Sequence, residues 1–355
     1  MTSETQFQDA KKLLGQLIAC PSLSREEDGT ATIIEDFFNT KGIPTHRLHN
    51  NVWASNVLFD PNKPTILLNS HHDTVKANPS WAVDPFSALE IDGKLIGLGS
   101  NDAGASLVCL ILTFCHFYEA QLPFNLVIAA TGEEENSGAN GIESLLKSSE
   151  FPKISWAIIG EPTDCQLAIA EKGLMVIDAV STGKSGHAAR EEGINAIDLA
   201  IEDILKINAY KFPKNSTLLG PVKTSVTVIN AGKQHNVIPE ICEFSIDCRV
   251  NECYSLEEVF ETLQQLVKAE LKPRSLRLKP SKIESQHPIV QAAEKLGIPT
   301  FGSPTLSDQT LLHCPSVKIG PGHSGRSHTA DEYILLDELK QGIQTYQTLL
   351  EQLNS

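Results

Sequence analysis

The sequence predicts an α/β fold with a mostly parallel sheet, into which a smaller α+β domain is inserted. In the first half of the chain, short apolar runs alternate with helical patterns, as strands and helices do in a parallel sheet covered by helices. A region of alternating, half-buried strands follows, and the helix-and-strand pattern then returns near the C-terminus. The length of 355 residues also favours two domains, because single hydrophobic cores stop growing at ~250–300 residues.

Three apolar runs in the first half have the continuous hydrophobicity typical of strands that are buried on both faces. They are residues 64–69, 125–130 and 156–159, and polar residues follow each run directly. Helical patterns at 105–119 and about 140–147 separate them. Because ligands of open α/β sheets bind beyond the carboxyl ends of the strands, we expect these polar residues to form a site.

The pattern changes after residue 173, where alternating apolar residues indicate strands with one buried face. The predicted elements are a strand at 174–180, a helix at 195–210, strands at 224–229 and 242–250, a helix that starts at a Ser255–Glu258 capping box and runs to about 271, and a last strand at 275–278. The order βαββαβ is that of a ferredoxin-like sandwich. We therefore expect one domain of residues 1–173 and 281–355, with residues 174–280 inserted into it.

The charge balance excludes some classes of partner. The chain has 29 Lys and Arg against 44 Asp and Glu, which gives a formal net charge of −15. Nucleic acids and anionic membranes attract basic surfaces, so we expect neither partner. We also expect no signal peptide, and the apolar stretch at 107–118 is too short to span a bilayer. Eight cysteines without a C-x-x-C pair are predicted to be reduced, and the protein cytoplasmic.

Acidic residues and histidines gather after the predicted strands. Asp73, Asp102 and the triplet Glu133–Glu135 occupy such loops. If the loops converge, up to five carboxylates share one crevice, and they cannot all stay ionised without a cation among them. Imidazole and carboxylate without thiolate suit Zn²⁺ in a catalytic site, with Co²⁺ or Mn²⁺ as substitutes. A single glutamate triplet is more typical of a solvated loop, but four such loops at strand ends, counting that of Glu161, favour a metal site.

Short stretches along the chain match one family of hydrolases in the order of its motifs. They are SHHDTV, GSNDAG, TGEEENSG, GEPTD and SHTADEY outside the inserted region, and GKSGHAA, HNVIP and DCR within it. They extend from Ser70 to Tyr333 and cover nearly the whole chain. With them the sequence resembles the co-catalytic zinc hydrolase family of acetylornithine deacetylase, succinyl-diaminopimelate desuccinylase and glutamate carboxypeptidase, and its deacetylase-type members most.

The resemblance implies two zinc ions per subunit, bound in the domain of residues 1–173 and 281–355. His71 and Glu161 would bind the first ion, and Glu135 and His328 would bind the second. Asp102 would bridge the two ions. In the family a cis peptide bond often follows this bridging aspartate, and the resemblance implies the same bond here.

The resemblance also implies the roles of the acids beside these ligands. Asp73 would orient His71 through the second ring nitrogen of that histidine. Glu134 would be the general base, which takes a proton from the metal-bridging water and delivers it to the leaving amine. The family usually has Asp-Glu-Glu at the triplet, and a shift by one residue would make Glu133 the base and Glu134 a ligand. The Asn-Ser-Gly that follows Glu135 favours the register in which Glu134 is the base and Glu135 is a ligand.

In the inserted domain, the resemblance implies contacts with substrate and with a second subunit. His187 matches a histidine that the family supplies from the partner subunit to the tetrahedral oxyanion, which implies a homodimer formed through this domain. The domain then also acts as a lid. Arg249 would clamp the substrate α-carboxylate, and Asn236 would donate a hydrogen bond to the same substrate. The alternative for His187 is a loop histidine without a role, and the alternative for Arg249 is a surface ion pair. The sequence leaves open whether Arg326 and His323 contact substrate.

The function that follows is a di-zinc amide hydrolase that removes an N-acyl group, in the first place acetyl, from the α-nitrogen of an amino acid. N-acetylornithine and N-acetylcitrulline, intermediates of arginine biosynthesis, are the first substrates expected. An N-succinyl amino acid desuccinylase and a dipeptidase or carboxypeptidase are the nearest alternatives, since no motif reports the acyl and side-chain pockets. A metal-free binding protein of the same fold is a remote alternative, because all five ligands and the base are present.

Overall fold

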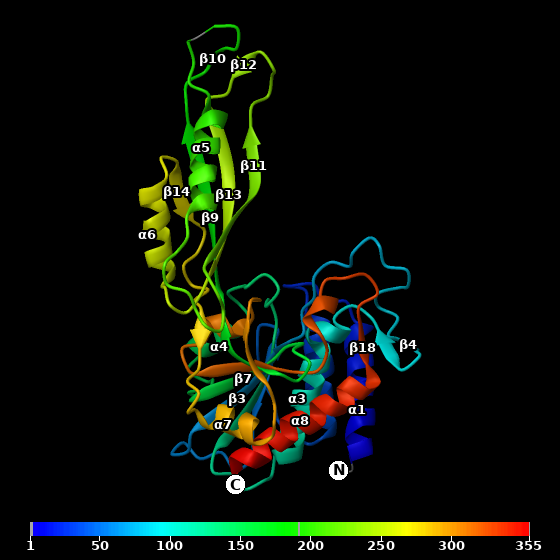
Figure 1. The fold of residues 1–355 in the computed structure, drawn as a ribbon. Helices are drawn as coiled ribbons and strands as arrows, with labels where there is room; N and C mark the ends of the chain where they lie inside the picture. The colour runs from blue at the N-terminus through cyan, green and yellow to red at the C-terminus, as the bar shows by residue number, and fades with distance from the viewer. Residues whose placement is uncertain (1–2, 191, 355) are drawn as a thin grey trace. The chain divides into compact units, whose positions relative to one another are not determined.

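The computed structural model of the protein describes residues 3–190 and 192–354 (Figure 1). The chain divides into two compact units. Unit 1 comprises Met1–Ile169, Ile283–Phe301 and Ser307–Ser355. Unit 2 comprises Ala170–Lys282 and Gly302–Leu306, so that it interrupts unit 1 in the sequence.

Unit 1 is built on a central sheet whose middle strands are parallel. These strands are β3 (Thr65–His71), β6 (Asn125–Thr131), β7 (Trp156–Gly160) and β17 (Ser316–Ile319), in the spatial order β6-β3-β7-β17. Antiparallel strands flank them, namely β2 (Asn51–Ser55) and β1 (His46–Leu48) beyond β6, and β8 (Leu167–Glu171) beside β17. β8 also pairs with β15 (Ser281–Lys282) and β16 (Thr300–Ser303). Every residue of the four parallel strands is buried, as the continuous apolar runs predict for β3, β6 and β7.

Helices cover this sheet. α3 (Ala105–Phe117) lies against β3, β6 and β7, and α1 (Ser3–Ile18) and α8 (Leu336–Asn354) pack against α3 (Figure 1). Burial by both sheet and helices explains why α3 is apolar nearly throughout, and each buried leucine or isoleucine there contributes about 1.5–3 kcal/mol. Further helices of unit 1 are α2 (Asp28–Thr40), α4 (Ile142–Lys147) and α7 (Pro288–Lys295).

A small antiparallel sheet holds the loop that precedes α8. β4 (Leu89–Ile91) and β5 (Lys94–Ile96) form a hairpin around Asp92 and Gly93, whose φ angles of 51° and 73° are those of a tight hairpin turn. β18 (Tyr333–Leu335) pairs with β5, which ties the loop after β17 to unit 1 at both ends. Three short helical turns also lie in loops of unit 1, η1 (Ser100–Gly104), η2 (Asp308–Leu311) and η3 (Ser324–Arg326).

Unit 2 has the βαββαβ order that the sequence predicts. β9 (Gly173–Thr182), β11 (Lys223–Ala231), β13 (Ile241–Val250) and β14 (Glu270–Pro273) form an antiparallel sheet in the order β11-β13-β9-β14. α5 (Ala196–Ala209) and α6 (Leu256–Leu266) pack against it and against each other. The side chain of Asn195 caps α5, and the predicted capping box of Ser255 and Glu258 starts α6.

Two boundaries in unit 2 differ from the prediction. α6 ends at Leu266 rather than near residue 271, and the last strand is β14 rather than residues 275–278. Asp203 of α5 accepts the backbone N–H groups of Lys268 and Ala269 at 2.9 and 2.8 Å, which turns the chain out of the helix early. The structure also contains a pair of two-residue antiparallel strands that the sequence pattern did not indicate, β10 (Gly186–His187) and β12 (Val237–Ile238), here called the β10–β12 ribbon.

The predicted fold class is thus confirmed in its main features. The central sheet of unit 1 is parallel in its middle, and unit 2 is an antiparallel sheet with two helices. Within the described part of the chain, no helix is long and apolar enough to cross a membrane.

Candidate metal centre and active site

The predicted metal ligands lie beyond the carboxyl ends of the parallel strands of unit 1. His71 is the last residue of β3, Glu134 and Glu135 follow β6, and Glu161 follows β7 directly. His328 lies in the loop after β17. Parallel strands bring these ends to one edge of the sheet, which is where open α/β sheets bind their ligands.

Asp102 lies between the two predicted histidine ligands. Its Oδ1 is 3.3 Å from Nε2 of His71, and its Oδ2 is 3.6 Å from Nε2 of His328. Each oxygen of one carboxylate therefore faces a different imidazole. The peptide bond between Asp102 and Ala103 is cis, and this prediction from the resemblance is confirmed.

The predicted carboxylate ligands divide between the two histidines. Oε1 of Glu161 is 3.9 Å from Nε2 of His71, and Oε2 of Glu135 is 3.0 Å from Nε2 of His328. Oε2 of Glu134 is also 3.9 Å from Nε2 of His71. Ligand atoms of His71, Asp102 and Glu135 all lie within 4.8 Å of one another, which is close enough for them to hold a metal ion together.

The chemistry of this group fits divalent metal ions. It combines two imidazoles with four carboxylates and contains no thiolate, which is the donor set of a catalytic rather than a structural metal site. His71 and Glu161 are both buried, at 1% and 8% exposure. Carboxylates crowded in this way repel one another unless cations lie among them. The residues present therefore fit a metal centre better than a site without metal.

The acids and histidines of the site shift each other's pKa values. Burial alone would lower the pKa of His71, but the carboxylates around it, Glu134 first, raise that pKa well above its usual value. Burial raises the pKa of Glu134 well above its usual range, against the attraction of His71. The hydrogen bond with Glu135 raises the pKa of His328 to about 9. A metal ion bound by His71 or His328 would displace the proton of that histidine and release it to solvent.

Asp73 contacts more than the histidine that it was predicted to orient. Nδ1 of His71 is 3.0 Å from the backbone oxygen of Asp73 and 3.4 Å from its carboxylate Oδ1. Shorter hydrogen bonds to this carboxylate come from the Ser24 hydroxyl at 2.7 Å and from the backbone N–H groups of Glu134 and Glu135 at 3.1 Å each. Asp73 therefore connects the strand that carries His71 to the turn that carries the predicted base.

Glu133 turns its side chain away from the other acids. Its carboxylate accepts hydrogen bonds from Nδ2 and the backbone N–H of Asn140, at 3.0 and 3.3 Å. A Cβ at Gly138 would collide with this carboxylate, so the turn needs glycine there. The backbone of Glu133 has a φ of 57°, in the left-handed region that side chains rarely adopt. Glu134 and Glu135, rather than Glu133, lie beside the histidines.

Glu332 is a buried acid of the site that the sequence did not single out, although it lies within the SHTADEY stretch. Its carboxylate accepts the backbone N–H groups of Gly99, Asn101 and Asp102 at 3.2, 2.8 and 2.9 Å. Burial raises its pKa to about 8. Glu332 thus fixes the backbone around Asp102, whose carboxylate lies between His71 and His328.

Asp308, in η2, is a second buried acid that was not predicted. It accepts hydrogen bonds from Nδ2 of Asn69 at 2.9 Å and from the hydroxyl of Thr131 at 2.8 Å. Burial raises its pKa to about 6. Because Asn69 lies on β3 and Thr131 ends β6, Asp308 connects the ends of the two strands that lead to His71 and to the glutamate triplet.

The structure separates the predicted substrate residues of unit 2. His187 lies in β10 and Asn236 directly precedes β12 of the β10–β12 ribbon, where the Ala188 N–H donates to the Asn236 backbone oxygen at 3.0 Å. Arg249 lies near the end of β13 that is farther from this ribbon, roughly 26 Å along the strand from the nearer end. Asp247 binds its guanidinium with two hydrogen bonds, of 2.9 and 3.1 Å. The resemblance implied that Arg249 and Asn236 bind one substrate, but within unit 2 they do not meet.

Arg326 and His323, whose roles the sequence left open, have partners within unit 1. Arg326 forms hydrogen bonds of 2.6 and 2.9 Å with the Glu338 carboxylate and stacks on the ring of Tyr333. Nδ1 of His323 accepts the backbone N–H of Gly325 at 2.9 Å. These contacts hold the loop that carries the predicted ligand His328.

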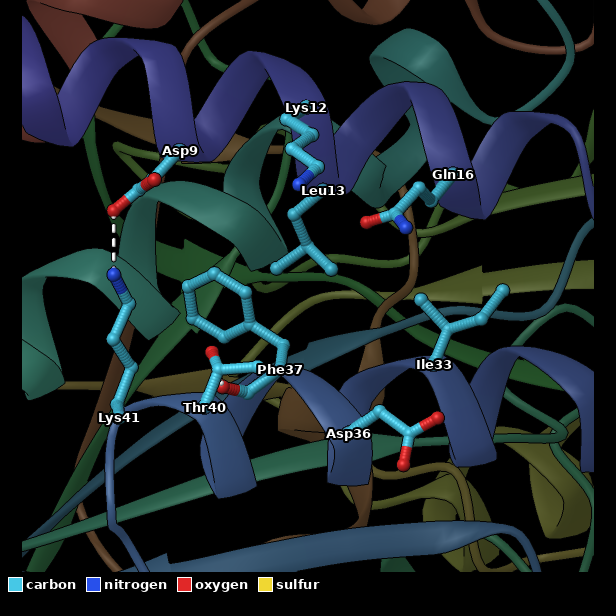
Figure 2. Close-up of a pocket in the computed structure, with 9 residues that line it drawn as sticks. All are labelled: Asp9, Lys12, Leu13, Gln16, Ile33, Asp36, Phe37, Thr40 and Lys41. Carbon is cyan, nitrogen blue, oxygen red and sulfur yellow. Dashed lines mark hydrogen bonds and ion pairs between the residues drawn. The ribbon is translucent and has the colours of Figure 1, made fainter.

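A hollow of about 200 Å³ elsewhere in unit 1 lies between α1 and α2 (Figure 2). Lys41 at its edge pairs with Asp9 at 2.6 Å and lies over the ring of Phe37. The residues that line this hollow include no histidine or cysteine and none of the predicted site residues. The groups suited to metal binding and proton transfer lie at the edge of the sheet instead.

A comparison with known families shows which family the chain belongs to. Residues 67–352 match the family described as Peptidase family M20/M25/M40, and this range includes all five predicted ligands and the predicted base. The chain belongs to the M20 peptidase family. It is therefore a hydrolase, and the family resemblance found from the motifs is confirmed.

Relatives of this M20 member include two kinds of amino-acid deacylase. Acetylornithine deacetylase of Shigella sonnei is 30% identical over 90% of the chain and 91% of its own length. Acetylornithine deacetylase of Proteus mirabilis is 29% identical, with 91% of each chain covered. Succinyl-diaminopimelate desuccinylase 2 of a Ruegeria species is 23% identical over 93% of this chain and 91% of its own.

Solved structures of low sequence identity share the fold. Aminopeptidase PepT of Bacillus cereus has a TM-score of 0.78 at 18% identity, with both chains covered fully. The YXEP protein of Bacillus subtilis, described as a dinuclear metal-binding peptidase of the M20 family, has a TM-score of 0.75 at 18% identity, with 98% of each chain covered. These likenesses support the α/β hydrolase fold of this M20 member.

Proposed function

We propose that this M20 family member is a di-zinc amide hydrolase that removes the acetyl group from an N-acetyl amino acid such as N-acetylornithine or N-acetylcitrulline. The observation that carries the proposal is the position of Asp102, which has one carboxylate oxygen toward each of two histidines. A carboxylate with this orientation is suited to bridge a pair of metal ions.

The residues around Asp102 form two sets of ligands. His71 and Glu161 would hold one zinc ion, and His328 and Glu135 would hold the other. When bound, the zinc ions would lower the pKa of water and polarise the acyl carbonyl. Asp102, between the two sets, would belong to both.

Glu134 is the residue that we assign as general base. It would accept a proton from the attacking water and then give that proton to the nitrogen of the leaving amine. The burial that raises its pKa makes its carboxylate a stronger proton acceptor near neutral pH. The hydrogen bonds of Glu133 to Asn140 support this register over the one in which Glu133 is the base.

The β10–β12 ribbon of unit 2 supports a role for His187 in the active site of a partner subunit. Nδ1 of His187 accepts the backbone N–H of Ala189 at 3.1 Å, so Nε2 carries the proton of the neutral ring and can donate to an oxyanion. Because Arg249 and His187 lie at opposite ends of β13, we assign them to different subunits, with His187 and Asn236 coming from the partner. A substrate carboxylate would have to replace Asp247 on Arg249.

Exposed apolar side chains support a homodimer formed through unit 2. β11 is an edge strand, and its Val228 and Ile229 are 48% and 50% exposed. Ile201 and Leu205 on the neighbouring α5 are 47% and 63% exposed. A free strand edge beside apolar side chains is typical of a surface that pairs with a second copy of the chain.

The relatives support the choice of acyl group. The acetylornithine deacetylases are 29% and 30% identical to this chain, and the succinyl-diaminopimelate desuccinylases are 23% and 25% identical. We therefore place the enzyme in arginine biosynthesis in the cytoplasm. A desuccinylase or a di-zinc dipeptidase is the second candidate.

A panel of N-acetyl amino acids, N-succinyl amino acids and dipeptides, assayed by the amine released, tests the proposal. We expect N-acetylornithine or N-acetylcitrulline to be hydrolysed, the activity to be lost on chelation, and Zn²⁺ or Co²⁺ to restore it. Turnover of succinyl compounds or dipeptides alone would replace the assignment with the second candidate. Protein purified without chelators that contains no metal and hydrolyses nothing would favour a non-catalytic binding protein.

A further inference from the structure

Two buried carboxylates hold the backbone of the turn that carries the proposed base. Asp73 accepts the N–H groups of Glu134 and Glu135, as described above. Glu27, from the loop before α2, accepts the N–H of Glu133 with its Oε1 at 3.0 Å. Three successive amides of the turn therefore donate to side chains from distant parts of the chain.

Glu27 is only 1% exposed, and its hydrogen bonds come from neutral groups. Its Oε1 also accepts the backbone N–H of Arg25 at 2.6 Å, and its Oε2 accepts Nδ2 of Asn50 at 2.7 Å. A buried carboxylate is costly unless its hydrogen bonds are complete. The position of this side chain is therefore set by all three donors at once, and one of them is the turn of the proposed base.

The amide of Asn50 has one orientation that satisfies its neighbours. Its Oδ1 accepts a hydrogen bond from Nη2 of Arg47 at 3.2 Å, while its Nδ2 donates to Glu27. Arg47 is itself held by the carboxylates of Asp28 and Glu35 on α2, at 2.6 and 3.0 Å. If the Asn50 amide were rotated by 180°, its NH₂ would face the guanidinium of Arg47, and because both groups are hydrogen-bond donors no bond could form.

We propose that Glu27 is a positioning residue for the general base. By holding the N–H of Glu133, it keeps the turn in the conformation in which the Glu134 carboxylate lies beside His71 and the Glu133 carboxylate faces Asn140. The inference rests on the proposed role of Glu134. Glu27 itself lies outside the motifs that indicate the family, and it acts through the backbone of the turn.

Glu27→Gln tests this role because it keeps the size of the side chain. The introduced amide oxygen can still accept from Glu133 and Arg25, but the introduced NH₂ then faces the NH₂ of Asn50. A displacement of the order of 1 Å at a catalytic group costs up to about 100-fold in rate. We expect kcat to fall about 10- to 100-fold, with KM within about twofold and bound metal unchanged.

A second substitution should reverse the effect. In Glu27→Gln/Asn50→Asp, the carboxylate introduced at position 50 accepts from the introduced amide and from Arg47 together. This double variant should recover kcat to within about threefold of the wild type. Glu26→Gln is the matched control, because Glu26 is the exposed neighbour of Glu27, and it should equal the wild type in every measurement.

Amide hydrogen exchange of residues 131–138, measured by mass spectrometry, provides a readout that needs no substrate. Exchange should be faster in Glu27→Gln and return to the wild-type rate in the double variant. If the wild type hydrolyses none of the acyl amino acids, the proposed function fails, while exchange still tests whether Glu27 holds the turn. Unchanged exchange or unchanged kcat in Glu27→Gln would overturn the inference. A loss of kcat that the double variant does not reverse, or that accompanies loss of metal, would overturn it as well.

Discussion

Glu134→Gln removes the charge of the proposed base and keeps the size of its side chain. No proposed metal ligand changes, so the bound metal should stay at two ions per chain. General-base catalysis contributes 10²–10⁴-fold, so the activation free energy should rise by about 3–5 kcal/mol. Because the proton transfer belongs to the transition state, kcat should fall by this factor while KM changes little. Steady-state kinetics and elemental analysis of the same preparation measure both quantities.

The same substitution should stabilise the metal-free protein. Burial raises the pKa of Glu134 in the folded state, so the folded protein binds this proton more tightly than the unfolded chain does. The stability that the group contributes is therefore lost as the pH rises from the unfolded pKa of about 4.3 through the raised folded value. Glutamine removes this loss. At pH 7 the chelated variant should melt at a higher temperature than the chelated wild type in differential scanning fluorimetry.

Glu133→Gln is the matched variant for this experiment. The Glu133 carboxylate binds Asn140 and does not face the histidines, so its substitution should leave kcat within about threefold of the wild type. The reasoning is refuted if Glu133→Gln abolishes turnover while Glu134→Gln loses a metal ion. The register of the triplet would then be shifted by one residue, and Glu134 would be a ligand.

Three further predictions concern stability and assembly. Asp203→Ala leaves two backbone N–H groups after α6 without their acceptor and should lower the free energy of unfolding by about 2–4 kcal/mol in urea denaturation. A value near zero would mean that water replaces the carboxylate. In chelated protein, the pKa of His328 of about 9 means that its stabilising contribution is present below about pH 6.5 and lost as the pH rises through 9. The melting temperature should fall across this window, and His328→Ala should flatten the profile; a flat wild-type profile would contradict the pairing with Glu135. Leu205→Asp should convert a dimer to a monomer in light scattering, and a fully active wild-type monomer would remove the proposed role of His187 in trans.

The sequence predicted the parallel strands and the positions of the acids after them because both depend on local order. An apolar run that ends in a polar residue is enough to place His71 at the end of β3 and Glu161 after β7. The pairing of Arg249 with Asp247 could also be predicted from the sequence, because residues two apart in a strand lie on the same face. A surface ion pair was the alternative to the predicted role of Arg249, and Asp247 does bind its guanidinium.

Features that depend on contacts between distant residues could not be predicted from local patterns. The apolar pattern of α6 runs past Leu266, and the helix ends there because Asp203, some 65 residues earlier, binds the next amides. Glu27 lies 106 residues before the amide that it holds, in a stretch without a motif. Glu332 does lie in a motif, but its three bonds to the backbone around Asp102 follow from the fold alone.

The acidic excess of the chain has a structural explanation in part. Two zinc ions would offset four of the 15 negative charges and leave about −11. Around the site some acids face the histidines and others hold backbone amides; Glu27 and Glu332 hold amides, and Asp73 does both. Buried carboxylates that accept the amides of a loop keep that loop ordered before a metal ion binds. Metal binding then costs less conformational entropy. We therefore expect the site to depend on these acids as much as on the ligands, although they touch neither metal nor substrate.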